Sequence, residues 1–386
     1  MATITRVLLA ADGPFHFGKR GVGLNETEVV LPADALFSAL CHALQMAEGT
    51  AALETLLAAF PKYAKPDNAR PPFRLTSLMP SIWVQPEAPK AQSPQTIDLL
   101  PMPLLRPKFT NADGIALRKQ MKEITWVSRA IFQKLAQGQN LAEDEEAVER
   151  QGERRIPYTV QEGAVWLSRT EFDWVGGEKC LLWKVDTRPR VTVDRISTAA
   201  TAFSSGGVYF INRPKLKVSL YALLRWEAAA ATQKALVKQA FAVLGESGIG
   251  GERSYGYGQF RPEFAEIADD LGAAQGDYFT ILAPYLPQPT ERAVFAEPAR
   301  YTIILRRGWL SVPGYTQLRR PTVRMVDTGA ILHQLSGQRV VGALADATPE
   351  LLKQTAPLTI HRYGLAWPVP IAAAALTDNQ GSEQHA

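Results

Sequence analysis

Residues 245–260 read Gly-Glu-Ser-Gly-Ile-Gly-Gly-Glu-Arg-Ser-Tyr-Gly-Tyr-Gly-Gln-Phe and contain six glycines. Glycine permits positive φ angles and lets a ligand approach the backbone closely. Successive N–H groups in such a loop can cradle an anion, and the Arg253 guanidinium suits phosphate. Tyr255 and Tyr257 add flat faces on which a base can stack. The stretch therefore predicts an RNA ligand, and an ordinary flexible surface loop is the alternative.

The glycine-rich loop joins a helix to a strand. Gly245 stands where a helix C-cap glycine belongs, and residues 257–264 favour a strand. A dinucleotide fingerprint runs the other way, from strand to helix, and needs a glycine where Arg253 stands. A Walker loop needs Gly-Lys-Ser/Thr, which the stretch lacks. We therefore expect no cofactor. The helix is predicted from apolar residues at helical spacing, namely Leu236, Val237, Ala240, Phe241 and Leu244.

Composition describes an ordinary globular protein of one to three domains, with 386 residues, 46% hydrophobic and 21% charged. The net charge is only +4, but basic residues cluster locally. Residues 186–261 contain eleven Lys and Arg against five Asp and Glu, and residues 300–324 contain six Arg and no acid. Such segments favour phosphate binding that weakens as salt rises.

Other classes of protein find little support. The two cysteines, Cys41 and Cys180, lie far apart, and no acidic cluster has metal-ligand spacing, so we expect no metal. Arg6 and Asp12 interrupt the short apolar N-terminus, which argues against a secretory signal. No stretch approaches the roughly 20 apolar residues that span a bilayer. We expect a cytoplasmic protein with no membrane contact.

The order of predicted elements indicates the fold class. Residues 3–11 favour a strand and Pro32 begins a helix; residues 61–107 then hold eleven prolines, and we interpret them as extended segments lying over another surface. Strands over 165–174 and 181–185 precede a hairpin across 212–215, which leads to the glycine-loop helix. The resulting β-α-β-β-α-β order is typical of ferredoxin-like folds.

We therefore predict an α+β chain of two tandem ferredoxin-like (RRM-like) domains. The first spans residues 1–266, with a large irregular insertion at about 61–206 and the glycine-rich loop at 245–258. The second, residues 267–386, is a degenerate copy that ends in a disordered tail.

A second basic segment precedes the predicted hairpin. Arg188, Arg190 and Arg195 flank hydroxyl side chains that can contact phosphates and riboses, and a surface β-turn is the alternative. A shorter glycine-punctuated loop near the N-terminus carries two further cations. The full set of predicted RNA-binding residues is Lys19, Arg20, Arg188, Arg190, Arg195, Ser197, Gly248, Gly250, Gly251, Arg253, Ser254, Tyr255 and Tyr257.

Several motifs together resemble one family. The chain is similar to the Csm-type member of the repeat-associated RAMP superfamily, in register over nearly its whole length. The glycine loop marks the superfamily, and the terminal segments favour the Csm type. The residues that carry the resemblance are Phe17-Gly, Asp34-Ala-Leu-Phe-Ser-Ala-Leu-Cys, Gly207-Val-Tyr-Phe, Gly248 to Gly258, Met325 with Thr328-Gly-Ala, and Arg362-Tyr-Gly-Leu-Ala.

The resemblance implies a structural role in a type III-A CRISPR effector complex. Its relatives cap the five-prime handle of the guide RNA (crRNA) and dock between the large polymerase-like subunit and the first backbone RAMP subunit. It implies two tandem RRM-like domains and no catalysis by this chain.

Two other functions remain open. Some relatives are metal-independent ribonucleases that process precursor crRNA and need a general base, usually histidine. Of the five histidines, His16 in the N-terminal glycine loop is the one candidate, with Tyr255 or a lysine as its partner. The equivalent capping subunit of a type III-B complex is the other alternative.

Overall fold

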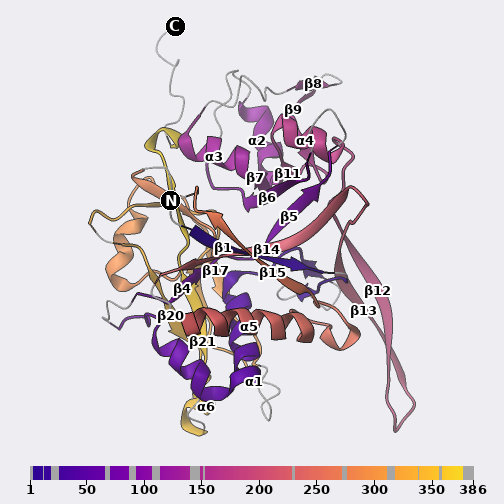
Figure 1. Ribbon diagram of the computed structural model, residues 1–386, viewed down its shortest axis with the longest axis vertical. Coiled ribbons are helices and arrows are strands. Elements are labelled where there is room, and N and C mark those ends of the chain that lie inside the picture. Colours follow the sequence, from indigo (N-terminus) through magenta and orange to yellow (C-terminus); the bar gives the residue numbers. More distant parts are fainter. Residues whose placement is uncertain are drawn as a thin grey trace.

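The computed structural model is a mixed α+β fold built around one large sheet (Figure 1). It describes residues 3–11, 13–18, 26–65, 70–86, 93–106, 114–139, 148–150, 153–227, 231–271, 276–310, 318–337, 339–355 and 359–376. Lys19 and Arg20, both predicted RNA contacts, and the tail beyond residue 376 lie outside the described residues.

The centre of the large sheet is β1 (Thr3–Ala10), which lies between β14 (Leu216–Trp226) and β15 (Arg261–Ala268). All these pairings are antiparallel, and β14 pairs on its other side with β5 (Met79–Val84) and β4 (Phe73–Leu75). Two helices, α1 (Ala33–Ala58) and α5 (Ala231–Ser247), pack against one another below the sheet in Figure 1.

The helices bury the faces that their sequences predict. In α1 the apolar residues Leu36, Phe37, Leu40 and Leu44 are all buried, as period 3.6 requires of a core-facing helix. The order β1-α1-β5-β14-α5-β15 follows the β-α-β-β-α-β pattern expected for the first half of the chain. The division into two tandem domains of this kind stays a prediction.

The proline-rich stretch is not an irregular layer over another surface. It supplies β4 and β5 to the sheet, which continues through strands further along the chain. Proline lacks a donor, but its fixed φ is compatible with extended backbone, so Pro80 stands inside β5 opposite Leu220. The continuing strands are β6 (Gln95–Pro101), β7 (Trp126–Ser128), β11 (Val165–Trp166) and β10 (Thr159–Val160).

Three short helices accompany this end of the sheet: α2 (Gly114–Glu123), α3 (Arg129–Gln137) and α4 (Arg169–Val175). The predicted strand over 165–174 is wrong beyond Trp166, because Ser168 and Glu171 form a capping box that begins α4. Two small strand pairs complete this half, namely β2 (Phe17–Gly18) with β3 (Thr27–Glu28), and β8 (Val148–Arg150) with β9 (Glu153–Arg155).

The C-terminal half divides its described strands among three small sheets. One is β19-β16-β22, with β16 (Tyr278–Ile281) between β19 (Ile331–His333) and β22 (Pro368–Ile371). The others pair β17 (Ile303–Arg306) with β18 (Val323–Val326) and β20 (Gly342–Asp346) with β21 (His361–Leu365). A short α6 (Glu350–Thr355) follows β20.

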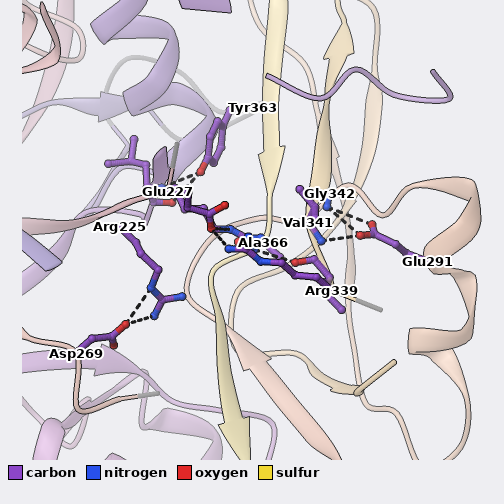
Figure 2. A network of polar contacts seen from close by, with 12 residues as sticks. Arg225, Glu227, Asp269, Glu291, Arg339, Val341, Gly342, Tyr363 and Ala366 are labelled. Carbon is purple, nitrogen blue, oxygen red and sulfur yellow. Dashed lines mark hydrogen bonds and ion pairs between the residues drawn. The ribbon is translucent and has the colours of Figure 1, made fainter. Parts of the chain in front are cut away.

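A buried ionic network joins the two halves (Figure 2). The Arg74 side chain is 1% exposed, and its Nε donates to Glu227 Oε1 at 2.6 Å. Its Nη1 donates to the carbonyls of Val340 and Ala366 at 2.9 and 2.8 Å, and Arg339 reaches the same carboxylate from the other side. We call these residues the seam. Because each carboxylate and carbonyl partner is fixed by a different strand or loop, the network locks the halves in one register.

Candidate nucleic-acid interface

The glycine-rich loop is folded tightly against residues 14–17. Gly251 N–H donates to the His16 carbonyl at 2.8 Å, and Gly258 N–H donates to the Pro14 carbonyl at 2.9 Å. Gly250 has φ +95°, and a Cβ there would lie 2.4 Å from the His16 carbonyl oxygen. Only glycine fits such a conformation and approach. The glycines therefore shape and dock the loop.

Half of the loop backbone is engaged within the chain itself. Seven N–H groups of the loop already donate to carbonyls of the chain itself, so they are not directed at a ligand. Among the side chains of the loop, those of Arg253, Ser254 and Tyr255 are exposed and can contact a ligand. The seven engaged residues are Gly248, Ile249, Gly251, Tyr255, Gly256, Tyr257 and Gly258.

A long two-stranded ribbon, β12 (Trp183–Val193) with β13 (Ala200–Phe210), leaves the body beside the end of α5 (Figure 1). The surface β-turn that the sequence left as the alternative for this segment is wrong, because residues 188–193 and 200–203 lie in paired strands. The hairpin predicted between residues 208–211 and β14 is also wrong. Residues 208–210 pair with β12, and β14 belongs to the main sheet. The alternation of apolar and polar residues within a strand does not reveal which strand it pairs with, and this explains the wrong pairing of residues 208–211.

The base of the ribbon is fixed to the loop region by hydrogen bonds. Phe15 and Val208 exchange backbone bonds at 3.0 and 2.8 Å. The His16 Nδ1 lies 2.8 Å from the Gly206 carbonyl oxygen. Residues 14–17 therefore hold the glycine-rich loop on one side and the ribbon on the other.

Arginine and tyrosine side chains join the ribbon to the loop. The Arg190 guanidinium lies 3.9 Å from the centre of the Tyr255 ring and 5.6 Å from that of Tyr257, and its Nε is 3.8 Å from a Glu252 carboxylate oxygen. Arg188 lies 5.0 Å from the centre of the Tyr209 ring. The structure thus brings together residues from both predicted basic segments, and we call Arg188, Arg190, Tyr209, Tyr255 and Tyr257 the arginine–tyrosine cluster.

The two predicted stacking tyrosines differ. Tyr255 is 57% exposed, whereas Tyr257 is 5% exposed and its hydroxyl lies 3.1 Å from that of Tyr209. Tyr257 is therefore a packing residue and not an open platform for a base. Burial and Tyr257 raise the pKa of Tyr209 to about 12, so this phenol stays protonated at neutral pH. The sequence prediction missed Tyr209, although the Gly207-Val-Tyr-Phe motif contains it.

Arg195 and Ser197 lie apart from the cluster, at the exposed ribbon tip of residues 194–199. There Asp194 Oδ1 accepts hydrogen bonds from the N–H groups of Ile196 and Ser197 at 2.8 and 3.4 Å. These bonds hold the pKa of Asp194 below its usual value of 3.8. The predicted RNA residues of the ribbon thus divide between the part that contacts the glycine-rich loop and the tip.

His16, which the ribonuclease alternative requires, is 4% exposed and contacts Gly206 and Gly251. Among the described residues, no group of three or more His, Cys, Asp or Glu is placed to hold a metal ion. In the same part of the chain, no helix is long and apolar enough to cross a membrane.

Comparison with known proteins finds relatives of similar sequence in the C-terminal part and of similar fold over nearly the whole chain. Residues 274–371 match the family described as CRISPR Csm4 C-terminal domain. A chain of the Csm3–Csm4 subcomplex of the type III-A CRISPR-Cas interference complex superposes with a TM-score of 0.59 and 13% identity, over 95% of this chain and 99% of that one. A chain of the Csm1–Csm4 cassette in complex with pppApA gives 0.54 and 15%, over 98% and 100%. No curated protein matches the sequence.

The fold is therefore shared with these two chains of CRISPR complexes, over nearly the full length of each. The C-terminal part of the chain is in addition similar in sequence to the Csm4 C-terminal domain. The resemblance stated from the sequence motifs is confirmed.

Proposed function

We propose that this chain is a non-catalytic RNA-binding subunit of a cytoplasmic type III-A CRISPR ribonucleoprotein and caps the five-prime handle of the crRNA. The observation that supports it best is the arginine–tyrosine cluster beside the glycine-rich loop. There Arg188 and Tyr255 are exposed, and the Arg190 guanidinium lies 3.9 Å from the centre of the Tyr255 ring. Guanidinium groups pair with phosphates, and aromatic faces stack on unpaired bases.

The proposal includes the partners of the chain. The solved relatives contain Csm4 together with Csm3 or with Csm1. By likeness, this chain docks the large polymerase-like subunit and a backbone RAMP subunit in antiviral and anti-plasmid defence. Co-expression with the type III-A subunits and a guide tests this, because the chain should co-purify and crosslink to the first guide nucleotides. Co-purification with type III-B subunits instead would favour that alternative.

Salt dependence of RNA binding tests the RNA contact. Each phosphate neutralised on single-stranded RNA contributes about 0.7 to the slope of log K against log salt. The triple variant Arg188→Ala, Arg190→Ala, Arg195→Ala should flatten this slope by about two units. The matched control is the triple variant Arg169→Ala, Arg292→Ala, Arg324→Ala, which removes the same charge from exposed positions elsewhere. Equal effects of the two would mean that only net charge matters and would contradict the assignment.

The absence of catalysis is tested separately. Purified protein should leave a repeat RNA intact with or without divalent metal. Cleavage that disappears in His16→Ala, with folding retained, would establish the ribonuclease alternative.

A further inference from the structure

A second basic site lies on α1, away from the arginine–tyrosine cluster. Asp34, in the first turn of α1, is fully buried and is held by Arg306 Nη2 at 2.9 Å and by Arg362 Nη1. One turn later, the Ser38 hydroxyl accepts a hydrogen bond from Arg320 Nη1 at 3.2 Å. We call Arg306, Arg320 and Arg362 the arginine triad.

The triad carries more positive charge than its surroundings offset. Arg306 and Arg362 pair with the Asp34 carboxylate, and Arg306 also interacts with Asp327, so three guanidinium groups face two carboxylates. Among the described residues, the buried Nε atoms of Arg320 and Arg362 have no hydrogen-bond acceptor, and the Arg362 side chain is only 4% exposed. Burial lowers the pKa of both arginines, which is the response of a cation that lacks compensation. An anion at the triad would relieve this cost.

The triad is connected to the glycine-rich loop along one helix face. Asp34, Ser38 and His42 follow one another at i, i+4 and i+8, so they form a single stripe on α1. At its first end the stripe meets Arg306 and Arg362. At its last end, burial and then the nearby Arg253 guanidinium lower the pKa of His42. Arg253 is the exposed cation of the glycine-rich loop.

The triad can be reached from the surface, because the Arg306 side chain is 23% exposed and Arg320 is half-buried. The N-terminal end of a long helix also favours negative charge. An anion at the surface can therefore reach the triad at Arg306 and Arg320.

We infer that the bound RNA strand extends from the glycine-rich loop to the arginine triad, and that one of its phosphates is held there. The inference rests on the proposed function and names a second anchor for the same RNA. A carboxylate of a partner protein at the triad is the competing occupant, and the test below separates the two.

The test measures binding of the full-length chain to a single-stranded RNA of about 16 nucleotides at several salt concentrations. Arg320→Gln should reduce the salt slope by about 0.7 and the affinity on the order of tenfold. Arg324→Gln is the matched control: it loses the same charge from the same segment, but its side chain lines a separate pocket with Tyr63 and Ile303. The control should retain the parental slope.

Equal slopes for Arg320→Gln and the parent would overturn the inference and favour a protein carboxylate at the triad. If Arg320→Gln does not fold, Ser38→Asp serves instead, since its added carboxylate beside Arg320 should repel a phosphate and lower RNA affinity. Unchanged affinity in a folded Ser38→Asp would overturn the inference as well.

Failure of the two proposals is distinguishable. If the Arg188, Arg190 and Arg195 triple variant weakens RNA binding but Arg320→Gln does not, the RNA function stands and the second anchor falls. If the parent chain binds no RNA at low salt, both fall.

Discussion

The seam and the ribbon base both rely on arginine, but they use it under opposite conditions. In the seam, Arg74 is 1% exposed and donates to a carboxylate and two carbonyls (Figure 2). At the ribbon base, Arg188 is exposed and lies near the Tyr209 ring. Among the described residues, no carboxylate pairs with it. A buried arginine whose Nε and Nη1 already donate to acceptors of the chain is committed to the fold. An exposed arginine on an aromatic face can still accept a phosphate, so burial and partners, rather than residue type, separate structural from functional arginines.

The largest effect is expected in the seam. Arg74→Met keeps apolar volume but leaves the buried Glu227 with a single cation and two carbonyls without a donor, so the free energy of unfolding should fall by about 3–5 kcal/mol. Arg188→Met at the ribbon is the control and should change it by less than about 0.5 kcal/mol. Urea denaturation of both variants measures the difference. Similar losses in both would refute the distinction between the two regions.

A smaller effect is expected where the glycine-rich loop docks. Gly250→Ala places a Cβ against the His16 carbonyl at a positive φ, so it should cost about 2–3 kcal/mol of stability. Gly256 also has positive φ, at +80°, but a Cβ there meets nothing within 4 Å, so Gly256→Ala should cost only about 1 kcal/mol. Thermal melting ranks the pair. If the order is reversed, the loop is not anchored on His16.

The smallest effect is local to the ribbon tip. Asp194 has a lowered pKa in the folded chain, so its contribution is complete above the ordinary value of 3.8 and is lost as pH falls through the lowered value. The protection factors of the Ile196 and Ser197 amides should therefore fall on acidification, while the seam stays protected. Asp194→Asn retains an oxygen acceptor and should abolish this pH dependence. Simultaneous loss of protection in tip and seam would show that the ribbon is not an independent unit.

Helical periodicity and the position of the glycine-rich loop could be predicted from sequence because both are local properties. The stripe of Leu36, Phe37 and Leu40 is buried as predicted, and the loop does join α5 to β15. The pairing of β13 could not be predicted, because Asn212-Arg-Pro-Lys has the composition of a tight turn between neighbours, whereas the partner of β13 precedes it in sequence.

Part of the candidate site could also be predicted, because the composition of its segments is a local property of the sequence. The sequence placed Arg190 and Tyr255 in two basic or aromatic segments, and the ribbon register brings them together. The burial of Tyr257 was not foreseeable, since it depends on Gly207 of another strand, where even a Cβ would lie 3.1 Å from the Tyr257 ring. The glycines of the loop were predicted to contact a ligand. In the structure, Gly250 lies against the His16 carbonyl and Gly258 against the Ile249 backbone, and sequence spacing does not reveal such neighbours.

The central position of β1 has a consequence for synthesis on the ribosome. Its partners β14 and β15 lie more than 200 residues later, so Val7 and Leu9 are made long before the strands that bury them. At about 5–20 residues per second, roughly 13–52 s separate the end of β1 from the end of β15. During that interval the nascent chain exposes an apolar strand with two open edges, so correct folding in the cell should depend on chaperones that shield it until residue 268 emerges.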